Sequence, residues 1–297
     1  MISRFLRSLS GDAAATHRGI SLANEYIRKL FHIEVEREKR CLLESDSKYK
    51  DPKNLNRFEF QIFSQSGQDG IINEIFRRIG ASHRVFVEFG VGAGGGMQNN
   101  TTNLLSQGWS GMWIEGNPHY FETIRKDLAF LIDRNKLTVV QNLVIKSNIN
   151  TILRDQKIPK DLDLLSIDID GNDIYVLEEI LGQYSPRVIA IEYNAYFPGN
   201  LNWKVDYSDS RVWDERGIEF GASLAAFCEL AARTEYQLVA CDLTGSDAFF
   251  VRKDLIGDKF QVVESPLDLY EPMRYHLIGT NGYQRRLTST FGLTIVM

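Results

Sequence analysis

The clearest chemical signal in this chain is an apolar stretch that runs into closely spaced glycines. Residues 85–94 read VFVEFGVGAG, so Glu88 is followed by Gly90, Gly92 and Gly94. Glycine has no Cβ, and a backbone built from it turns sharply and comes close to a ligand. In doubly wound α/β domains a strand that feeds such a turn begins a nucleotide site. The steps of two residues differ from the G-x-G-x-x-G of dinucleotide-binding domains, and a plain loop is the alternative interpretation.

A second acidic residue ends the next apolar stretch, residues 111–115. The carboxylate of Glu115 offers two acceptor oxygens, which suits the two hydroxyls of a ribose at the tip of a second strand. Asn117 and Pro118 then predict the start of a helix, because proline is pre-set for the first helical turn. The alternative is that Glu115 only caps a turn. The order of strand, glycine turn, helix, strand and acid favours a cofactor site.

Two further strand ends carry oxygen-bearing side chains. Asp168 and Asp170 alternate along one expected strand, which sends both to the same face, and Glu192 and Asn194 end the next. Two carboxylates so close are unfavourable unless a cation or hydrogen-bond donors lie between them. Oxygen ligands without His or Cys suit Mg²⁺ or Ca²⁺ rather than zinc. The alternative is that these side chains cap helices and hold loops.

Strands and helices alternate in the part of the chain that must position these residues. We expect strands at 84–89, 111–115, 137–144, 162–169, 188–193, 236–242 and 248–252, and helices at 69–79, 102–107, 120–134, 175–181 and 222–233. Strands separated by helices form a parallel sheet with both faces covered. The last two strands are joined by a short turn and predict a hairpin with one antiparallel strand. The predicted fold is therefore α/β and Rossmann-like, with a seven-stranded, mostly parallel sheet and a helical amino-terminal arm.

Composition is that of an ordinary globular protein, with 43% hydrophobic and 25% charged residues. The net charge of −5 gives no electrostatic footprint for nucleic acid. Cys41, Cys228 and Cys241 are few and widely spaced, which indicates a reducing compartment rather than a disulfide framework. We expect no transmembrane segment and no secretory signal, and a cytoplasmic location follows.

The chain divides into three predicted units. Residues 1–60 form a charged helical arm, in which Ile20, Ala23, Ile27, Leu30 and Phe31 recur at helical spacing, with a polar linker at 48–56. We expect this arm to pack on the domain or on a partner subunit, which would make a homo-oligomer, in preference to a membrane. Residues 61–256 form the catalytic domain, and residues 257–297 form an extension of unknown role.

Residues from about 60 to 255 resemble the FkbM-like family of class I S-adenosylmethionine-dependent methyltransferases. The glycine turn is similar to the first motif of such enzymes. The resemblance rests on residues 64–69 (SQSGQD), 87–90 (VEFG), 108–111 (GWSG), 114–118 (IEGNP), 168–173 (DIDGND) and 191–194 (IEYN). The chain departs from the family at 94–100, where GGGMQNN replaces a shorter acidic turn. Neither the first 60 nor the last 40 residues take part.

The resemblance implies a methyltransferase that uses S-adenosyl-L-methionine and acts on a hydroxyl of a sugar, glycan or natural product. It implies cofactor binding by Gln68, Glu88, Gly90, Gly92, Glu115, Asn142 and Asp168, and a cation such as Mg²⁺ at Asp168, Asp170, Glu192 and Asn194. The cation would lower the pKa of the hydroxyl and fix its direction.

Methyl transfer to a hydroxyl requires in-line positioning and a base that removes the proton. Candidate catalytic residues are Asp168, His119 and Lys146, with Tyr193 as a further candidate base; each also has a plain structural interpretation. The aromatic loop that contains Tyr196, Phe197 and Trp203 suits a hydroxyl-rich acceptor.

Two other functions stay open: an NAD-dependent or nucleotide-sugar oxidoreductase, and a non-catalytic scaffold.

Overall fold

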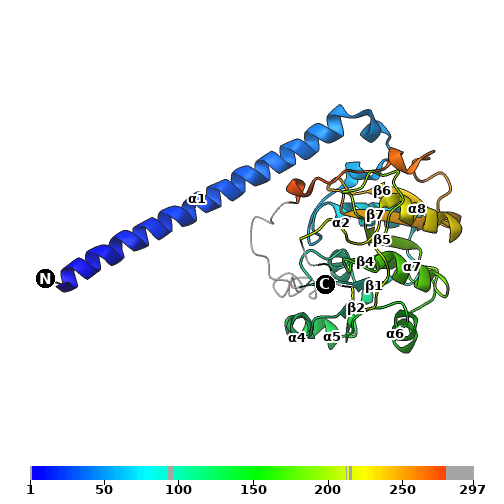
Figure 1. Cartoon of the computed structure of the whole chain (residues 1–297), viewed down its shortest axis with the longest axis horizontal. Coiled ribbons are helices and arrows are strands. Elements are labelled where there is room, and N and C mark those ends of the chain that lie inside the picture. The colour runs from blue at the N-terminus through cyan, green and yellow to red at the C-terminus, as the bar shows by residue number, and fades with distance from the viewer. Residues whose placement is uncertain (1, 93–95, 212, 214–215, 279–297) are drawn as a thin grey trace.

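A seven-stranded sheet with the order β3-β2-β1-β4-β5-β7-β6 forms the centre of the molecule (Figure 1). The computed structural model describes the chain except residues 1, 93–95, 212, 214–215 and 279–297, and the side chains from residue 19 onward apart from 266. The strands are β1 (Val85–Phe89), β2 (Ser110–Glu115), β3 (Leu137–Gln141), β4 (Leu164–Ile167), β5 (Val188–Glu192), β6 (Tyr236–Cys241) and β7 (Asp247–Arg252).

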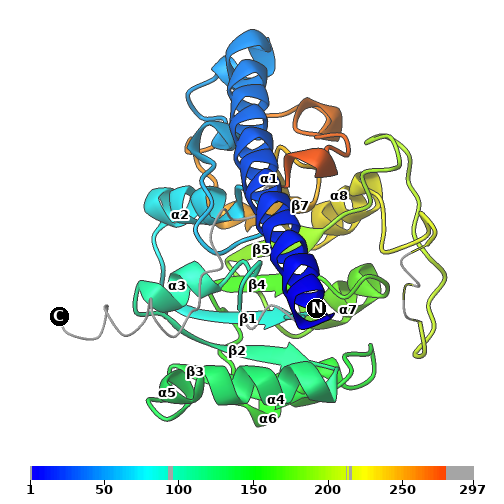
Figure 2. The ribbon, with the colours of Figure 1, turned by 90° about the vertical axis from the view of Figure 1, so that its left-hand side faces the viewer.

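The strand pairing confirms the predicted Rossmann-like sheet. The five strands β1 to β5 pair in parallel, whereas β7 is antiparallel to both β5 and β6. Figure 2 shows the strands stacked in this order, from β2 near the bottom to β7 near the top. The carboxyl ends of the parallel strands and the first residue of β7 therefore meet at one edge of the sheet.

Helices cover both faces of the sheet because successive strand residues point to opposite sides. Val87 and Phe89 face a core formed with α6 (Ile149–Asp155), α7 (Asp173–Leu181) and α8 (Leu224–Arg233). Phe86 faces the other core, to which α2 (Gln68–Ile79), α3 (Thr102–Ser106), α4 (Pro118–Asp127) and α5 (Ala129–Ile132) contribute. The expected doubly wound arrangement is thus confirmed.

The structure divides one of the expected helices and adds one that the sequence did not predict. The helix predicted at 120–134 is two helices, because Leu128 between α4 and α5 has ψ of 19° and its side chain is buried in the core. The seven-residue α6 was not predicted at all. Its short length gives little periodicity, although Ile149, Ile152 and Leu153 all reach the core.

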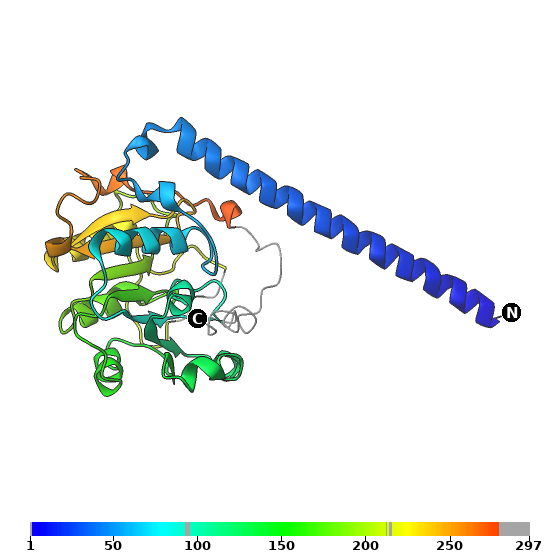
Figure 3. The same ribbon diagram turned by 180° about the vertical axis from the view of Figure 1, so that it is seen from behind.

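The amino-terminal arm is one long helix, α1 (Ile2–Ser45), that leads away from the domain (Figures 1 and 3). Among its described side chains, from residue 19 onward, Val35 near the carboxyl end is buried, which places packing on the domain, one of the two expected outcomes, at that end. None of the helices in the described part of the chain is both long and apolar enough to cross a membrane.

The segment expected as a polar linker is folded, which corrects that prediction. It forms two short 3₁₀ helices, η1 (Ser47–Lys50) and η2 (Leu55–Phe58), capped by the side chains of Asp46 and Asn54. Tyr49 and Leu55 are buried. Three further 3₁₀ turns follow the sheet: η3 (Lys253–Leu255), η4 (Pro266–Asp268) and η5 (Tyr275–Leu277).

A buried ion cluster joins the root of the arm to the carboxyl-terminal segment. The carboxylate of Glu271 is fully buried and lies 2.6 Å from Lys48 Nζ and 2.7 Å from Arg274 Nη1. The hydroxyl of Tyr49 donates to the same carboxylate at 2.9 Å. The units predicted at 1–60 and 257–297 thus contact each other, and the division into three units stays a prediction.

Candidate active site

The two glycines after β1 have different physical roles. Gly90 has φ of +72°, and a Cβ there would lie 1.5 Å from the carbonyl oxygen of Asp168. Gly90 is therefore required for the contact between the loops after β1 and β4. Gly92 has φ of +67°, but no described atom outside its chain neighbours lies within 4 Å of its Cβ position. Its backbone borders open space, as expected of a residue that a ligand approaches closely.

Glu88 anchors the loop that follows the glycines. Its buried carboxylate accepts hydrogen bonds from the backbone N–H of Asn100 at 2.8 Å and of Thr101 at 3.2 Å, and from the Thr101 hydroxyl. Burial raises the pKa of Glu88, and these hydrogen bonds partly offset that effect. The described contacts of Glu88 therefore hold the wall of a site together.

Glu115 connects the tips of β1 and β2. Its Oε2 accepts a hydrogen bond from the Gly92 N–H at 2.8 Å, and its Oε1 accepts one from the Asn117 N–H at 2.6 Å. Glu115 thus caps a turn, which was the alternative interpretation. Each carboxylate oxygen has a second acceptor position, so these contacts leave room for ribose hydroxyls.

A cavity of about 140 Å³ lies at the carboxyl edge of the sheet. It brings together six of the predicted residues, Gln68, Glu88, Gly90, Gly92, Asp168 and Glu192, and adds Gln65, Val91, Met97, Gln98, Asn99, Asn100, Ser246 and Asp247. Four of these side chains are acidic, and the described lining contains no lysine or arginine. The cavity is therefore suited to a positively charged group.

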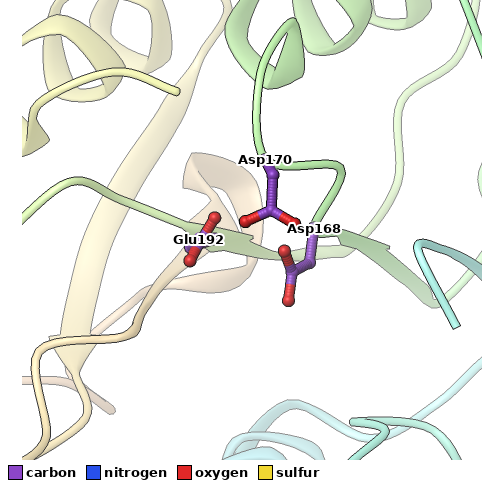
Figure 4. A group of neighbouring side chains, drawn as sticks. All are labelled: Asp168, Asp170 and Glu192. Atoms are coloured by element: carbon purple, nitrogen blue, oxygen red, sulfur yellow. The ribbon is translucent and has the colours of Figure 1, made fainter. Parts of the chain in front are cut away.

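Three carboxylates meet at the rim of this cavity. Asp168, Asp170 and Glu192 each offer an oxygen, and these oxygens all lie within 4.8 Å of one another (Figure 4). The strand expected to carry both aspartates ends at Ile167, so they lie in the loop after β4 instead. Asp170 has φ of +55°, and this turn, rather than strand alternation, brings the pair together. Asp173 holds the turn by accepting from the N–H groups of Ile169 and Gly171, both at 2.8 Å.

The electrostatics of this group favour a bound cation. Asp168 is an exposed residue that lines the cavity, while many protein atoms lie near its carboxyl group. This burial and then the repulsion by Asp170 raise the pKa of Asp168 well above its usual range. Burial, followed by repulsion from Asp168, does the same to Glu192. A cation between them would relieve this repulsion, and the residues therefore fit a divalent metal ion.

Asp247 is a site residue that the sequence did not reveal. It is the first residue of β7 and pairs with Glu192, and Asn100 Nδ2 donates to its Oδ2 at 2.9 Å. Burial and the nearby Asp242 raise its pKa to about 7. The strand topology identifies this residue, because the first residue of an antiparallel strand lies beside the last residues of the parallel strands next to it.

The motif at residues 64–69 builds the floor of the cavity. Asp69 Oδ2 accepts from the N–H groups of Ile62, Phe63 and Ser64 at 2.7–2.9 Å. Gln68 Oε1 accepts from Ser66 N–H at 2.7 Å, and the Ser66 hydroxyl donates to Asp242 at 2.8 Å. These contacts fix the loop before α2 beneath the cavity.

Several predicted site residues lie outside the described cavity. His119 is exposed at the start of α4, and its N–H donates to Asn117. Lys146 lines a separate polar groove, and Asn142 is exposed and accepts from Asn148. Asn194 is buried, and its amide donates to the carbonyls of Ile218 and Phe220. The buried hydroxyl of Tyr193 donates to the Glu271 carbonyl. The described lining of the cavity contains none of the candidate bases His119, Lys146 and Tyr193, and Asp168 is the predicted catalytic residue that it does contain.

Comparison with known proteins gives structural similarity alone. The sequence matches no protein-family model and no curated protein. Among solved structures it is similar to a candidate O-methyltransferase from Klebsiella pneumoniae (15% identity, 75% of this chain and 97% of the other, TM-score 0.44). It is also similar to an O-methyltransferase from Bacillus cereus in complex with SAH (17% identity, 74% of this chain and 88% of the other, TM-score 0.42). A third similar structure is the glycopeptide N-methyltransferase MtfA with S-adenosyl-L-homocysteine (17% identity, 72% of this chain and 96% of the other, TM-score 0.39). At these scores the similarity carries no conclusion, and the fold rests on the strand order.

Proposed function

We propose that the protein is an S-adenosylmethionine-dependent methyltransferase of the FkbM-like kind. The observation that carries this proposal is the acidic cavity at the carboxyl edge of the sheet, with Glu88, Asp168, Glu192 and Asp247 in its wall. A sulfonium and an ammonium group are both attracted to such a cavity. The anionic pyrophosphate of NAD or of a nucleotide sugar would be repelled, which disfavours the oxidoreductase.

The described residues fit this cofactor in two further respects. The Oδ1 atom of Asn99 is buried in the cavity wall and has no hydrogen-bond partner among the described residues, so it can accept from an amino group. Gly92 offers an open backbone edge, and Glu115 beside it offers acceptor positions for a ribose. The cofactor supplies the activated methyl group, and the protein supplies position and charge.

We further propose that the acceptor is a hydroxyl of a sugar, glycan or natural product. The oxygen-rich tip at Asp168 and Asp170 supports this proposal, because hydroxyl groups bind well to cations and carboxylates. The aromatic loop supports it less than the sequence indicates. The rings of Phe197 and Trp203 pack on each other, with centroids 4.2 Å apart. Tyr196 is 44% exposed, although its ring also contacts Phe220 and Tyr275 in edge-on geometry. A cytoplasmic location stays a prediction.

The first experiment is methyl transfer from labelled S-adenosylmethionine to a panel of sugars, nucleotide sugars and glycan fragments. We expect a label on a hydroxyl, and none on the matching deoxy compound, because a site built from hydrogen-bonding groups rejects a substrate that leaves them unpaired. A label on a protein lysine or a nucleic-acid base would refute the hydroxyl acceptor. Cofactor binding without transfer to any acceptor would favour the non-catalytic scaffold.

The second experiment tests the cation at Asp168, Asp170 and Glu192. Chelation with EDTA should abolish methyl transfer, and Mg²⁺ should restore it, because octahedral oxygen ligands at about 2.0–2.1 Å are what Mg²⁺ requires. If the cluster is structural, EDTA will leave the rate unchanged while Asp168→Ala lowers thermal stability. Measuring both quantities distinguishes the two roles.

A further inference from the structure

The α1 arm exposes a continuous apolar face that the domain does not cover. Ile20, Tyr26, Ile27, Leu30, Phe31 and Ile33 are all exposed, Leu30 to 66% and Ile27 to 61%. The helix projects from the domain in Figures 1 and 3, so this face has no neighbour among the described residues. Helices in water owe most of their stability to the packing of an apolar face, and large exposed apolar faces mark interaction sites.

The spacing on this face is that of a coiled coil. Ile20 and Ile27 fall at a positions of a heptad, and Ala23 and Leu30 fall at d positions. The same register gives Leu6, Leu9 and Ala13 toward the amino terminus, with Thr16 at the d position in between, and the apolar repeat ends after Leu30, because Glu34 and Arg37 follow. β-Branched residues at a with leucine at d favour two parallel strands. A repeat of 3.5 residues indicates a partner that is itself a helix.

The charges of the arm fit a second copy better than a membrane. Between residues 19 and 45 the acidic residues are Glu25, Glu34, Glu36, Glu38 and Glu44, and the basic ones are Arg28, Lys29, Arg37, Lys39 and Arg40. This segment therefore has no net charge, and the segments of two copies do not repel each other through net charge. Helices that bind anionic lipid surfaces carry an excess of Lys and Arg on their polar face, whereas the basic residues of this segment are matched in number by acidic ones.

The available area is also sufficient. Burial of six large side chains from each copy removes on the order of 1,000 Å² from water, which is about the size at which specific interfaces begin. On the opposite side of the helix, Glu25 and Lys29 form an ion pair at 2.6 Å, so the charged face points away from the apolar one. We propose that the α1 arms of two copies form a parallel, two-stranded coiled coil through the face that contains Ile20, Ala23, Ile27 and Leu30.

This inference is independent of the methyltransferase activity, and sedimentation velocity of the full chain between about 1 and 100 μM tests it. We expect a dimer. Ile27→Glu with Leu30→Glu should weaken dimerisation at least 100-fold, because two charges would be buried in the seam. The matched control, Ser21→Glu with His32→Glu, adds the same charge on the outer face and should dimerise normally. The domain melting temperature should not change in either variant, since neither pair packs on the domain.

Cysteine cross-linking tests the orientation. In a Cys41→Ser background, Ile20→Cys should form an intermolecular disulfide under mild oxidation, whereas Glu25→Cys should not, because only position 20 meets its equivalent across a parallel seam. The proposal is overturned if the wild-type chain is monomeric throughout, if the seam variant dimerises as well as the control, or if position 25 cross-links as readily as position 20. Co-sedimentation of a monomeric wild-type chain with phosphatidylserine vesicles would assign the face to a membrane instead.

Discussion

At the scale of single residues, Gly90 and Gly92 form a matched pair that separates folding from binding. Both have positive φ, but among the described residues a Cβ would meet a backbone oxygen at Gly90, at 1.5 Å, and would meet nothing at Gly92. Gly90→Ala should therefore lose about 2–5 kcal/mol of unfolding free energy from the strained conformation and the clash together. Gly92→Ala should lose only about 1–2 kcal/mol and should instead weaken S-adenosylmethionine binding about tenfold. Urea denaturation and calorimetry measure the two effects. Equal stability losses in the two variants would contradict these roles.

The raised pKa of Glu59 leads us to expect that the stability of the protein depends on pH. Its Oε1 accepts from Asn56 and from the Leu243 N–H, whereas its Oε2 is buried without a partner among the described residues. Burial, followed by repulsion from Asp242, raises its pKa to about 8 from the usual 4.5. The folded state therefore holds a proton that the unfolded chain releases. The contribution of Glu59 to the free energy of unfolding is fully present below its unfolded pKa of about 4.5. It is lost as the pH rises through the folded pKa of about 8.

Replacement by a neutral side chain should remove this pH dependence. Near pH 5 Glu59→Gln and the wild type should have similar unfolding free energies, and at pH 8.5 the variant should be more stable by on the order of a few kcal/mol. The control Glu122→Gln, on the exposed surface of α4, should follow the wild type. If the difference in unfolding free energy between Glu59→Gln and the wild type is the same at pH 5 and at pH 8.5, Glu59 does not titrate in this way.

Residue types and spacing predicted the acidic and glycine positions that line the cavity, because strand ends place such residues at one edge. They did not predict Asp247 or Glu59. Asp247 becomes a site residue through strand pairing. The Oε2 atom of the half-buried Glu59 is shielded from water because the loop before α2 contacts the turn between β6 and β7. Both placements depend on contacts between distant parts of the chain.

At the scale of elements, the turn between β4 and α7 depends on Asp173. Its two hydrogen bonds to backbone N–H groups fix the conformation that presents Asp168 and Asp170. Asp173→Ala should lose about 2–4 kcal/mol of stability, because it leaves buried N–H groups unpaired. It should also weaken binding of Mn²⁺, used as a probe for Mg²⁺. Asp161→Ala, which removes only an exposed partner of His83, should cost less than about 1 kcal/mol. The role of Asp173 is refuted if both substitutions have the same effect in urea denaturation.

Element types were easier to predict than element ends. Long apolar stretches identified all seven strands, but β3 and β4 are shorter than expected because their last residues turn into loops. The break at Leu128 and the short α6 leave little trace in the sequence, since both depend on which side chains reach the core. The 3₁₀ helices η1 and η2 are set by capping side chains within a segment that is polar on average.

At the scale of the whole molecule, alternation of strands and helices predicted the sheet and its antiparallel strand. This alternation did not predict how the segment after α1 contacts the segment that follows the sheet. The cluster of Lys48, Tyr49, Glu271 and Arg274 joins segments more than 200 residues apart, and no local pattern marks such a contact. The arm was expected to be helical and is, but its single long helix leaves the domain instead of packing along it.

The central claim is that the acidic cavity binds S-adenosylmethionine, and titration calorimetry with this cofactor and with NADH tests it most directly. We predict one S-adenosylmethionine per chain and no measurable binding of NADH. Glu115→Ala should weaken the cofactor about ten- to a hundredfold through lost charge-assisted hydrogen bonds, whereas Glu122→Ala should have no effect. Tighter binding of NADH than of S-adenosylmethionine, or an unchanged affinity in Glu115→Ala, would contradict the assignment.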